Sequence, residues 1–378
     1  MQTRRATSLL FLVASIAGAP AALAQWTESS GARSITVEGY ANLTTAASDG
    51  FEAGASRRDD PRADLAFRVL GKFKIDDGPD LGVRLVAESS PEDRLNLAEA
   101  SLLWSGNLGR LEVGERQGLP DVLTGYAPNN FSFTGAEYGP ASGPSLDPGG
   151  GLQHAFLPVG LAAQLDELGV LGAGASLAAD RAAKVVYVSP KRHGFLAGFS
   201  FAPDADDARF GALTQAGIVH ERYWDSNILR LGGSASIARG TRRSIDPVGD
   251  LHSVNIGAAL ILDDDLMLGV SATWNGASGT SRVNGDTSSA YGVTTSVNYN
   301  RGRWTMGGYL QWSTSEGDGA LAANDRLAAA QVGMSYRVTT KLRIYAAWYR
   351  LDFIDEGGAG AFGRQAGSQI FFGVRAAL

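Results

Sequence analysis

The chain contains no cysteine and only four histidines among its 378 residues. Without cysteine it cannot form a disulfide-braced scaffold, a thiolate metal site or a cysteine nucleophile. Four histidines leave little room for a metal centre built from several imidazoles. Charged residues are also scarce, at 19% against the roughly 25% of soluble domains. This shortage argues against intrinsic disorder, which is typical of highly charged chains.

Long hydrophobic runs are missing as well. The mean hydropathy is −0.06, whereas each helical membrane span needs about 20 consecutive apolar residues, so a protein with many membrane helices is excluded. Glycine, in contrast, is abundant, with 49 residues and therefore well above the usual ~7%. Abundant glycine and sparse charge predict many strands and turns, with small side chains that face a crowded or wet interior.

Residues 1–24 have the three parts of an export signal. Two arginines form a short basic start, residues 9–19 form an apolar core, and Ala-Leu-Ala at 22–24 forms a cleavage site. The apolar core is too short to span a membrane as a helix. The sequence therefore predicts a cleaved signal peptide over 1–24 and a mature chain that begins at Gln25.

The remainder, 25–378, contains segments in which apolar residues alternate with polar or small ones. The last segment is the clearest, because Ile370, Phe372 and Val374 share one face while Gly373 and Arg375 share the other. Side chains of a strand point alternately to two faces, so this period of two places each segment between an apolar and a polar environment. The sixteen predicted strands span 34–46, 62–75, 81–89, 96–105, 109–116, 182–189, 194–202, 212–225, 227–239, 251–262, 265–276, 287–300, 302–313, 326–338, 341–353 and 365–378.

The connections between these segments are alternately short and long. Seven are turn-like, such as 77–80 and 263–264, and eight are longer and polar. An up-and-down antiparallel barrel has this pattern, with tight turns on one rim and loops on the other. Aromatic residues also concentrate toward the segment ends, as at Trp304 and Trp312, like the two girdles of membrane barrels. The predicted fold class is thus all-β, a transmembrane antiparallel up-and-down barrel of about 16 strands, a number that encloses an aqueous channel.

The third long connection, 117–181, is the most unusual. Loops of this length are commonly functional or disordered. Apolar side chains such as Phe131 and Leu157 indicate that this one packs against another part of the chain. Its 64 residues from 117 to 180 contain no lysine or arginine but six acidic residues, namely Asp121, Glu137, Asp147, Asp166, Glu167 and Asp180.

Basic residues gather on the polar faces of the strands that flank this loop. If the loop folds into the lumen, its acidic residues face these bases and form a narrow eyelet with a transverse field. The basic side is predicted to hold Arg68, Arg84 and Arg116 at mid-height, with Lys72 and Arg110 nearer the periplasmic rim. The acidic side is predicted to consist of Asp121, Glu137 and Asp147. Alternatively, the bases line a solvated strand face and pair with nearby acids, for which the candidates are Glu38, Glu88, Glu99 and Glu112.

Two local motifs resemble those of the Gram-negative general porins, especially of α-proteobacteria. Residues 99–117 (EASLLWSGNLGRLEVGERQ) are similar to the strand–turn–strand before the constriction loop, and 136–140 (AEYGP) to the motif at the tip of that loop. The terminal strand resembles the family's assembly signal, although it ends in Leu378 where members usually end in Phe. The resemblance implies a homotrimer of 16-stranded barrels in the outer membrane of a Gram-negative bacterium. Small hydrophilic solutes and ions would diffuse through it without a cofactor, past a third loop folded into each lumen.

The resemblance also raises the question of calcium, because loop acids in some porins bind Ca²⁺ through carboxylate oxygens. The candidates here are Asp147, Asp166 and Glu167. The alternative is that these side chains are simply solvated. The loop is also longer than in most general porins, which predicts an additional helix or lid within 150–180.

Other functions fit the sequence less well. An enzyme is disfavoured because none of the histidines lies in a recognisable nucleophile motif. A nucleic-acid binder is disfavoured by a pI near 5.3 and by the lack of a basic domain. Two alternatives stay open, a substrate-specific outer-membrane channel and a soluble periplasmic β-protein or lectin. The histidines considered as catalytic bases are His154, His193, His220 and His252.

Overall fold

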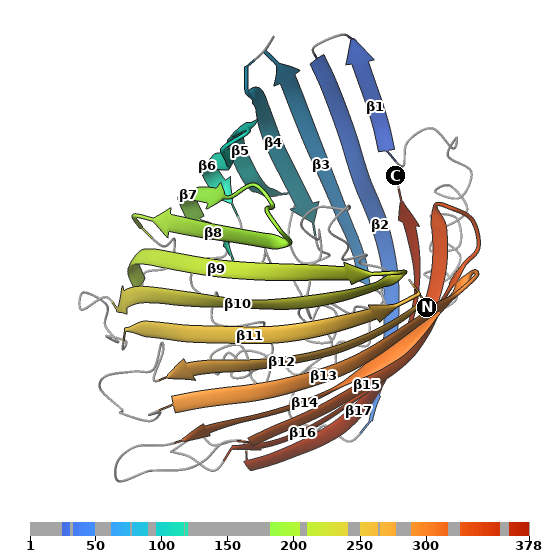
Figure 1. Ribbon diagram of the computed structural model, residues 1–378. Coiled ribbons are helices and arrows are strands. Elements are labelled where there is room, and N and C mark those ends of the chain that lie inside the picture. Colours follow the sequence, from blue (N-terminus) through green and yellow to red (C-terminus); the bar gives the residue numbers. More distant parts are fainter. Residues whose placement is uncertain are drawn as a thin grey trace.

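The computed structural model describes thirteen stretches of the chain, and these form seventeen β-strands (Figure 1). The described residues are 25–30, 33–49, 62–75, 78–89, 96–116, 118–119, 182–204, 210–240, 250–263, 265–276, 289–316, 326–355 and 363–377. The first nine strands are β1 (Gln25–Ser30), β2 (Arg33–Asp49), β3 (Arg62–Lys74), β4 (Asp80–Ser89), β5 (Asn96–Gly106), β6 (Gly109–Arg116), β7 (Ala182–Val188), β8 (Phe195–Ala202) and β9 (Phe210–Trp224). The other eight are β10 (Asn227–Gly240), β11 (Leu251–Leu262), β12 (Leu266–Gly276), β13 (Ser289–Arg301), β14 (Trp304–Glu316), β15 (Arg326–Arg337), β16 (Leu342–Asp355) and β17 (Gly363–Ala377).

Strands β2 to β17 form a closed ring of antiparallel pairs. Each strand pairs with its neighbours in sequence, and β9 pairs with β10 to join the two halves of the ring. The ring closes where β17 pairs with β2, with Arg375 opposite Asn42. A closed ring leaves no sheet edge exposed, which is the condition for strands to cross a membrane. The predicted fold class is confirmed, and every predicted strand boundary lies within three residues of the observed one.

Strand β1 is the one strand that the sequence analysis missed. It pairs with residues 33–38 of β2, while β17 pairs with residues 40–49 on the same edge (Figure 1). With 17 residues, β2 is longer than the roughly 9–11 residues that a membrane crossing needs. The excess length extends past the end of β17, and β1 occupies the edge that would otherwise be open there.

Burial alternates along the strands, so that the ring has two chemically different faces. On β7 every second residue from Ala182 is buried, and Val185 and Tyr187 between them are 40% and 38% exposed. The exposed positions of other strands are apolar too, for example Leu102, Ile256 and Leu310. The outward face is therefore an apolar belt suited to lipid, and the inward face carries the polar residues. Within the described residues, no helix has the length and apolar character of a membrane span.

Aromatic pairs lie at both ends of this belt. The rings of Trp304 and Tyr336 are 4.7 Å apart beside the short turn after β13, and those of Tyr291 and Trp312 are 5.9 Å apart toward the other rim. Eight residues of one strand separate Trp304 from Trp312, or about 26 Å along the chain. With the strand tilt of about 35–45° in outer-membrane barrels, this corresponds to about 20 Å along the membrane normal, close to the roughly 25 Å height of the apolar band.

Candidate functional site

Six charged side chains are buried together on the inner face of β3 to β7. Their positions alternate with exposed apolar residues, which places them on the lumen side of the wall. The strand register keeps them level, since Arg84 lies opposite Ser101, Ser101 opposite Gly114, and Gly114 opposite Lys184. We call this set, with the partly exposed Arg110, the inner charged cluster; its buried members are Arg68, Arg84, Glu99, Glu112, Arg116 and Lys184.

Arg116 and Glu112 are at the centre of the cluster. Arg116 is fully buried; its Nη1 donates to both carboxylate oxygens of Glu99, at 3.0 and 3.2 Å, and its Nε donates to Glu112 Oε2 at 2.5 Å. The other oxygen of Glu112 forms ion pairs with Arg110 Nε at 2.9 Å and Arg84 Nη2 at 3.8 Å. One carboxylate therefore holds three guanidinium groups together, an arrangement in which their mutual repulsion is offset by a shared counter-charge.

Gly114 makes the pairing of Glu112 with Arg116 possible. The two side chains are four residues apart on the same face of β6, and the residue between them has no side chain to separate them. The backbone of Gly114 has a φ of 140°, a value that L-residues rarely adopt. A Cβ atom there would lie 2.2 Å from the carbonyl oxygen of Ala100.

Gly114→Ala is therefore expected to destabilise the folded barrel. Backbone strain at such a φ costs about 1–3 kcal/mol, and the added methyl group also collides with β5. The temperature at which the folded form in detergent converts to the unfolded form on an electrophoresis gel should fall. Gly71→Ala is a matched control, because a Cβ atom at Gly71 meets nothing within 4 Å. Equal midpoints for the two variants would contradict this role for Gly114.

The inner charged cluster keeps a positive excess and unused donors. Its members are five bases and two carboxylates, which gives this set of described residues a formal charge of +3. Arg84 Nε and Nη1, Arg116 Nη2 and the hydroxyl of Ser101 are buried and have no hydrogen-bond partner among the described residues. Buried donors without partners are costly, and they bind an anion or a dipole more strongly than solvated ones do.

The inner face beyond β9 is different, because its buried side chains are mostly uncharged. Arg230 on β10 is an exception, and it lies 2.7 Å from Glu221 of β9. Among the buried described residues, charge is therefore concentrated on β3 to β7, and uncharged polar side chains predominate from β10 to β15. The buried uncharged polar residues from β10 to β15 are Ser234, Ser236, Ser253, Ser271, Ser296, Thr314, Gln331 and Ser335.

The start of the long third connection is inside the barrel. Leu119, three residues after β6, is fully buried against the inward-facing Val186, Val188 and Val219. Its amide donates to Gln215 Oε1 on β9 at 3.1 Å, so the chain turns inward and reaches the wall three strands away. The rest of 117–181, and with it Asp121, Glu137 and Asp147, lies outside the described residues. The same holds for the calcium candidates Asp166 and Glu167.

The structure places the five predicted bases in two groups. Arg68, Arg84 and Arg116 are buried on the inner wall, whereas Lys72 is exposed close to the short turn after β3. Arg110 also lies near a short turn, but it forms an ion pair with Glu112 and so belongs to the cluster. The two interpretations of the bases do not exclude each other, because Arg84 and Arg116 line the inner face and also form ion pairs with Glu112. Arg116 pairs with Glu99 as well. The side chains of Glu38 and Glu88 lie outside the description.

Lys184 is a member of the cluster that the sequence analysis overlooked. It stands between Ala183 and Val185 on a predicted strand, so alternation alone would have assigned it to the polar face. In the structure it is 3% exposed and level with Arg84.

A second, smaller charge cluster lies at the short-turn rim. Lys191, in the turn after β7, donates to Glu221 and also to the hydroxyl of Tyr223 at 3.1 Å. The ammonium lies 4.8 Å from the centre of the Tyr223 ring. Partial burial lowers the pKa of Lys191, but the hydrogen bonds to Glu221 and Tyr223 outweigh it and raise the pKa above its usual value. The lysine stays charged and fixes this turn to β9.

Comparison with known proteins agrees with this architecture. The family model of the Gram-negative porins matches residues 7–364. No curated protein sequence matches the chain. At identities below 25%, the similarity to solved structures described next concerns the fold alone.

Three solved structures illustrate this fold. OmpT of Vibrio cholerae is 13% identical with a TM-score of 0.63, covering 93% of this chain and 99% of that one; its trimer form gives 0.61. The anion-selective porin of Comamonas acidovorans is 16% identical with a TM-score of 0.60, covering 92% and 100%. OmpF of Salmonella typhi, in complex with daunomycin, is 11% identical with a TM-score of 0.62, covering 93% and 100%.

The match over most of the chain and the closed ring of sixteen antiparallel strands lead to one assignment. Family and fold point to a channel rather than to an enzyme. The chain belongs to the Gram-negative porins, outer-membrane barrels through which small solutes diffuse passively.

Proposed function

We propose that this porin passes small hydrophilic solutes and ions through a charged constriction. The inner charged cluster forms its basic side, and Asp121, Glu137 and Asp147 of the third loop form its acidic side. The observation that carries the proposal is the asymmetry of the wall, which has a buried positive excess on β3 to β7 and mostly serine beyond β9. Charge on one side of a low-dielectric pore produces a transverse field that orients dipolar solutes.

The position of Leu119 supports the acidic side of this arrangement. Its burial against β7 to β9 puts the third residue of the loop inside the barrel. A segment with no basic residue that enters next to five bases experiences a favourable field. Ca²⁺ at Asp147, Asp166 and Glu167 stays a prediction, which conductance before and after chelation would test.

Deleting residues 140–175 is expected to raise single-channel conductance about twofold, because a loop inside the lumen obstructs the current. The deletion leaves Leu119 and both flanking strands intact. Conductance of wild type and variant would be compared in planar bilayers at the same salt concentration. Unchanged conductance would place the deleted segment outside the lumen and remove the acidic side of the constriction.

We also propose that the chain forms a homotrimer. The support is the trimer form of the Vibrio cholerae protein, which shares the fold, together with the local motifs that resemble trimeric porins. The complex in mild detergent is expected to have three times the protein mass of one chain, measured by light scattering with the detergent contribution subtracted. A mass of one chain under conditions where the pore conducts would contradict this proposal.

A substrate-specific channel is the second candidate, and the unpartnered donors of Arg84 favour it. Such donors are suited to a small oxyanion. Flux of phosphate or a dicarboxylate through liposome-reconstituted protein would then saturate with concentration, whereas diffusion through a general porin rises in proportion.

A further inference from the structure

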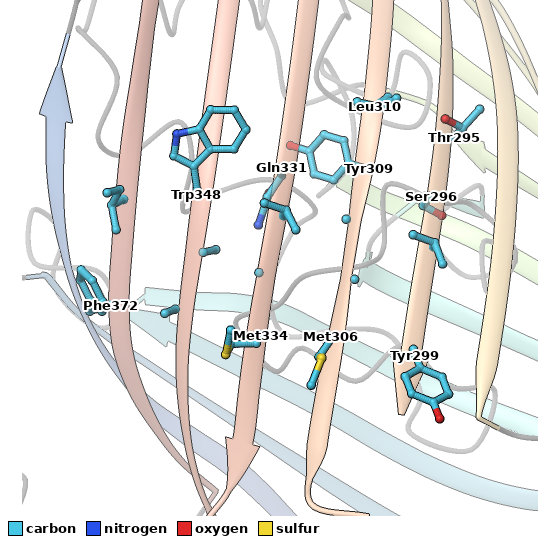
Figure 2. Close-up of a pocket in the computed structure, with 18 residues that line it drawn as sticks. Thr295, Ser296, Tyr299, Met306, Tyr309, Leu310, Gln331, Met334, Trp348 and Phe372 are labelled. Carbon is cyan, nitrogen blue, oxygen red and sulfur yellow. The ribbon is translucent and has the colours of Figure 1, made fainter. Parts of the chain in front are cut away.

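The outer face of β13 to β17 carries an apolar groove that the channel function does not use. It has a volume of about 880 Å³, within the range of about 300–1,000 Å³ of pockets that hold small molecules (Figure 2). Its floor is low at Gly308 and Ala346, and larger apolar side chains surround these two positions. The outward-facing residues around it include Tyr299, Met306, Leu310, Met334, Trp348 and Phe372.

The groove lies inside the apolar belt, and its two ends point toward the two rims of the barrel. Met306, Met334 and Phe372 are at its end toward the short turns, and Leu310 and Trp348 are at its end toward the long loops (Figure 2). The aromatic pairs of β13 to β15 described above lie beyond these two ends. The groove therefore opens to the hydrocarbon region, where a void would forfeit dispersion contacts and is filled by apolar groups.

Two exposed arginines lie beyond the long-loop end of the groove. Arg350 is close to that end, and Arg326 is about 13 Å farther toward the long-loop rim, because it lies four residues from Ala330, the cross-strand partner of Arg350. Arg350 follows Trp348 by two residues on the outward face of β16, and Arg326 begins β15 on the same face. Neither forms a hydrogen bond or ion pair with another described residue. The cross-strand neighbours of Arg350, Ala330 and Ser368, are small and leave its guanidinium open. Asp352, the next outward residue of β16, already has an interaction of its own.

We infer that this groove and its two arginines bind a lipid of the outer leaflet that bears a phosphate and a net negative charge. The guanidinium group of Arg350 pairs with the headgroup phosphate, and Arg326 adds positive charge nearer the rim. The acyl chains fill the groove over Gly308 and Ala346. Guanidinium matches phosphate geometry through two parallel hydrogen bonds, and arginines at a membrane surface attract anionic lipids. Exposed positive charge beside an apolar groove in the belt complements an anionic headgroup with acyl chains, so lipid is the occupant that the charges favour.

The test uses quenching of tryptophan fluorescence by brominated lipid. The full chain is reconstituted into phosphatidylcholine bilayers that contain a minor fraction of brominated phosphatidylglycerol or, separately, of brominated phosphatidylcholine. The contribution of Trp348 is the difference between wild type and Trp348→Phe. Quenching of Trp348 is expected to show enrichment of phosphatidylglycerol by about fivefold for each arginine over random mixing.

Matched variants identify the source of this enrichment. Arg326→Gln combined with Arg350→Gln should return quenching to random mixing, whereas Arg239→Gln, an exposed arginine at the end of β10, should leave it unchanged. Ala346→Leu, which fills the groove, should lower quenching while both arginines remain. Equal quenching by the two lipids would overturn headgroup recognition. Quenching of Trp348 by neither lipid would also overturn the proposal, because it would show that another protein surface covers this face.

Discussion

Replacing Glu112 by glutamine is expected to destabilise the barrel strongly and to make the pore more selective for anions. Glu112 is 1% exposed and neutralises three guanidinium groups, those of Arg84, Arg110 and Arg116. Removing one partner from a buried ionic network typically costs about 3–5 kcal/mol, because the remaining charges stay buried without compensation. The same substitution raises the positive excess of the cluster from three charges to four.

Two measurements test the two expected effects of Glu112→Gln, on stability and on ion selectivity. The unfolding midpoint of the purified protein in detergent reports stability, and the reversal potential in a salt gradient reports selectivity. Glu115→Gln is the matched control, since Glu115 lies on the outward face of the same strand, between Ala100 and Ala183. If both glutamine variants shift the two readouts equally, the effect belongs to the strand in general and not to the cluster.

Neutralising Arg68 and Arg84 together is expected to shift selectivity toward cations about fivefold. A unit charge at ~8 Å from an ion contributes about 0.5 kcal/mol even at the dielectric constant of water, so two charges contribute about 1 kcal/mol. Both arginines are on the inner wall, and two nitrogens of Arg84 have no partner among the described residues. Replacement by glutamine removes the positive charge and keeps a polar, uncharged side chain at each position.

The permeability ratio from the reversal potential in a KCl gradient measures this shift. Arg222→Gln is the control, because Arg222 is an exposed residue near the end of β9 and lies on the outward face. An unchanged ratio in the Arg68/Arg84 variant would mean that ions pass without sensing the inner charged cluster. That result would contradict the proposed charged constriction but not the barrel fold.

The alternation of apolar and polar residues along the sequence predicts most of the fold. Predicted and observed bounds coincide for 251–262 and 109–116, where most residues of one face are apolar. The segment 212–225 alternates poorly, and the structure shows why. Leu213 and Val219 are buried on the inner face of β9, and Val219 packs against Leu119 of the incoming loop. Packing inside the lumen thus removed the contrast between the two faces.

Strand β1 was missed for a different reason. Its six residues are too few to cross a membrane and show no long alternation. Its strand conformation depends on pairing with the part of β2 that extends past β17, which is a tertiary property. Short segments of this kind are specified by their neighbours more than by their own sequence.

The position of the candidate site was predictable from the sequence, but the ion pairs between its side chains were not. Period two puts Arg84, Glu112 and Arg116 on the same face, which is correct. It does not show that Arg116 reaches back over Gly114 to Glu112, because this contact depends on side-chain rotamers and on the absence of a Cβ atom between them. The two carboxylates in this network lower the formal charge of the inner charged cluster from +5 to +3.

Single-channel recording in planar bilayers with a KCl gradient tests the central claim most directly. A water-filled pore with a charged wall predicts discrete current steps whose size rises with salt concentration, together with a non-zero reversal potential that changes sign or size in the Arg68/Arg84 variant. Folded, membrane-inserted protein that gives no current steps would contradict the assignment of an open diffusion channel.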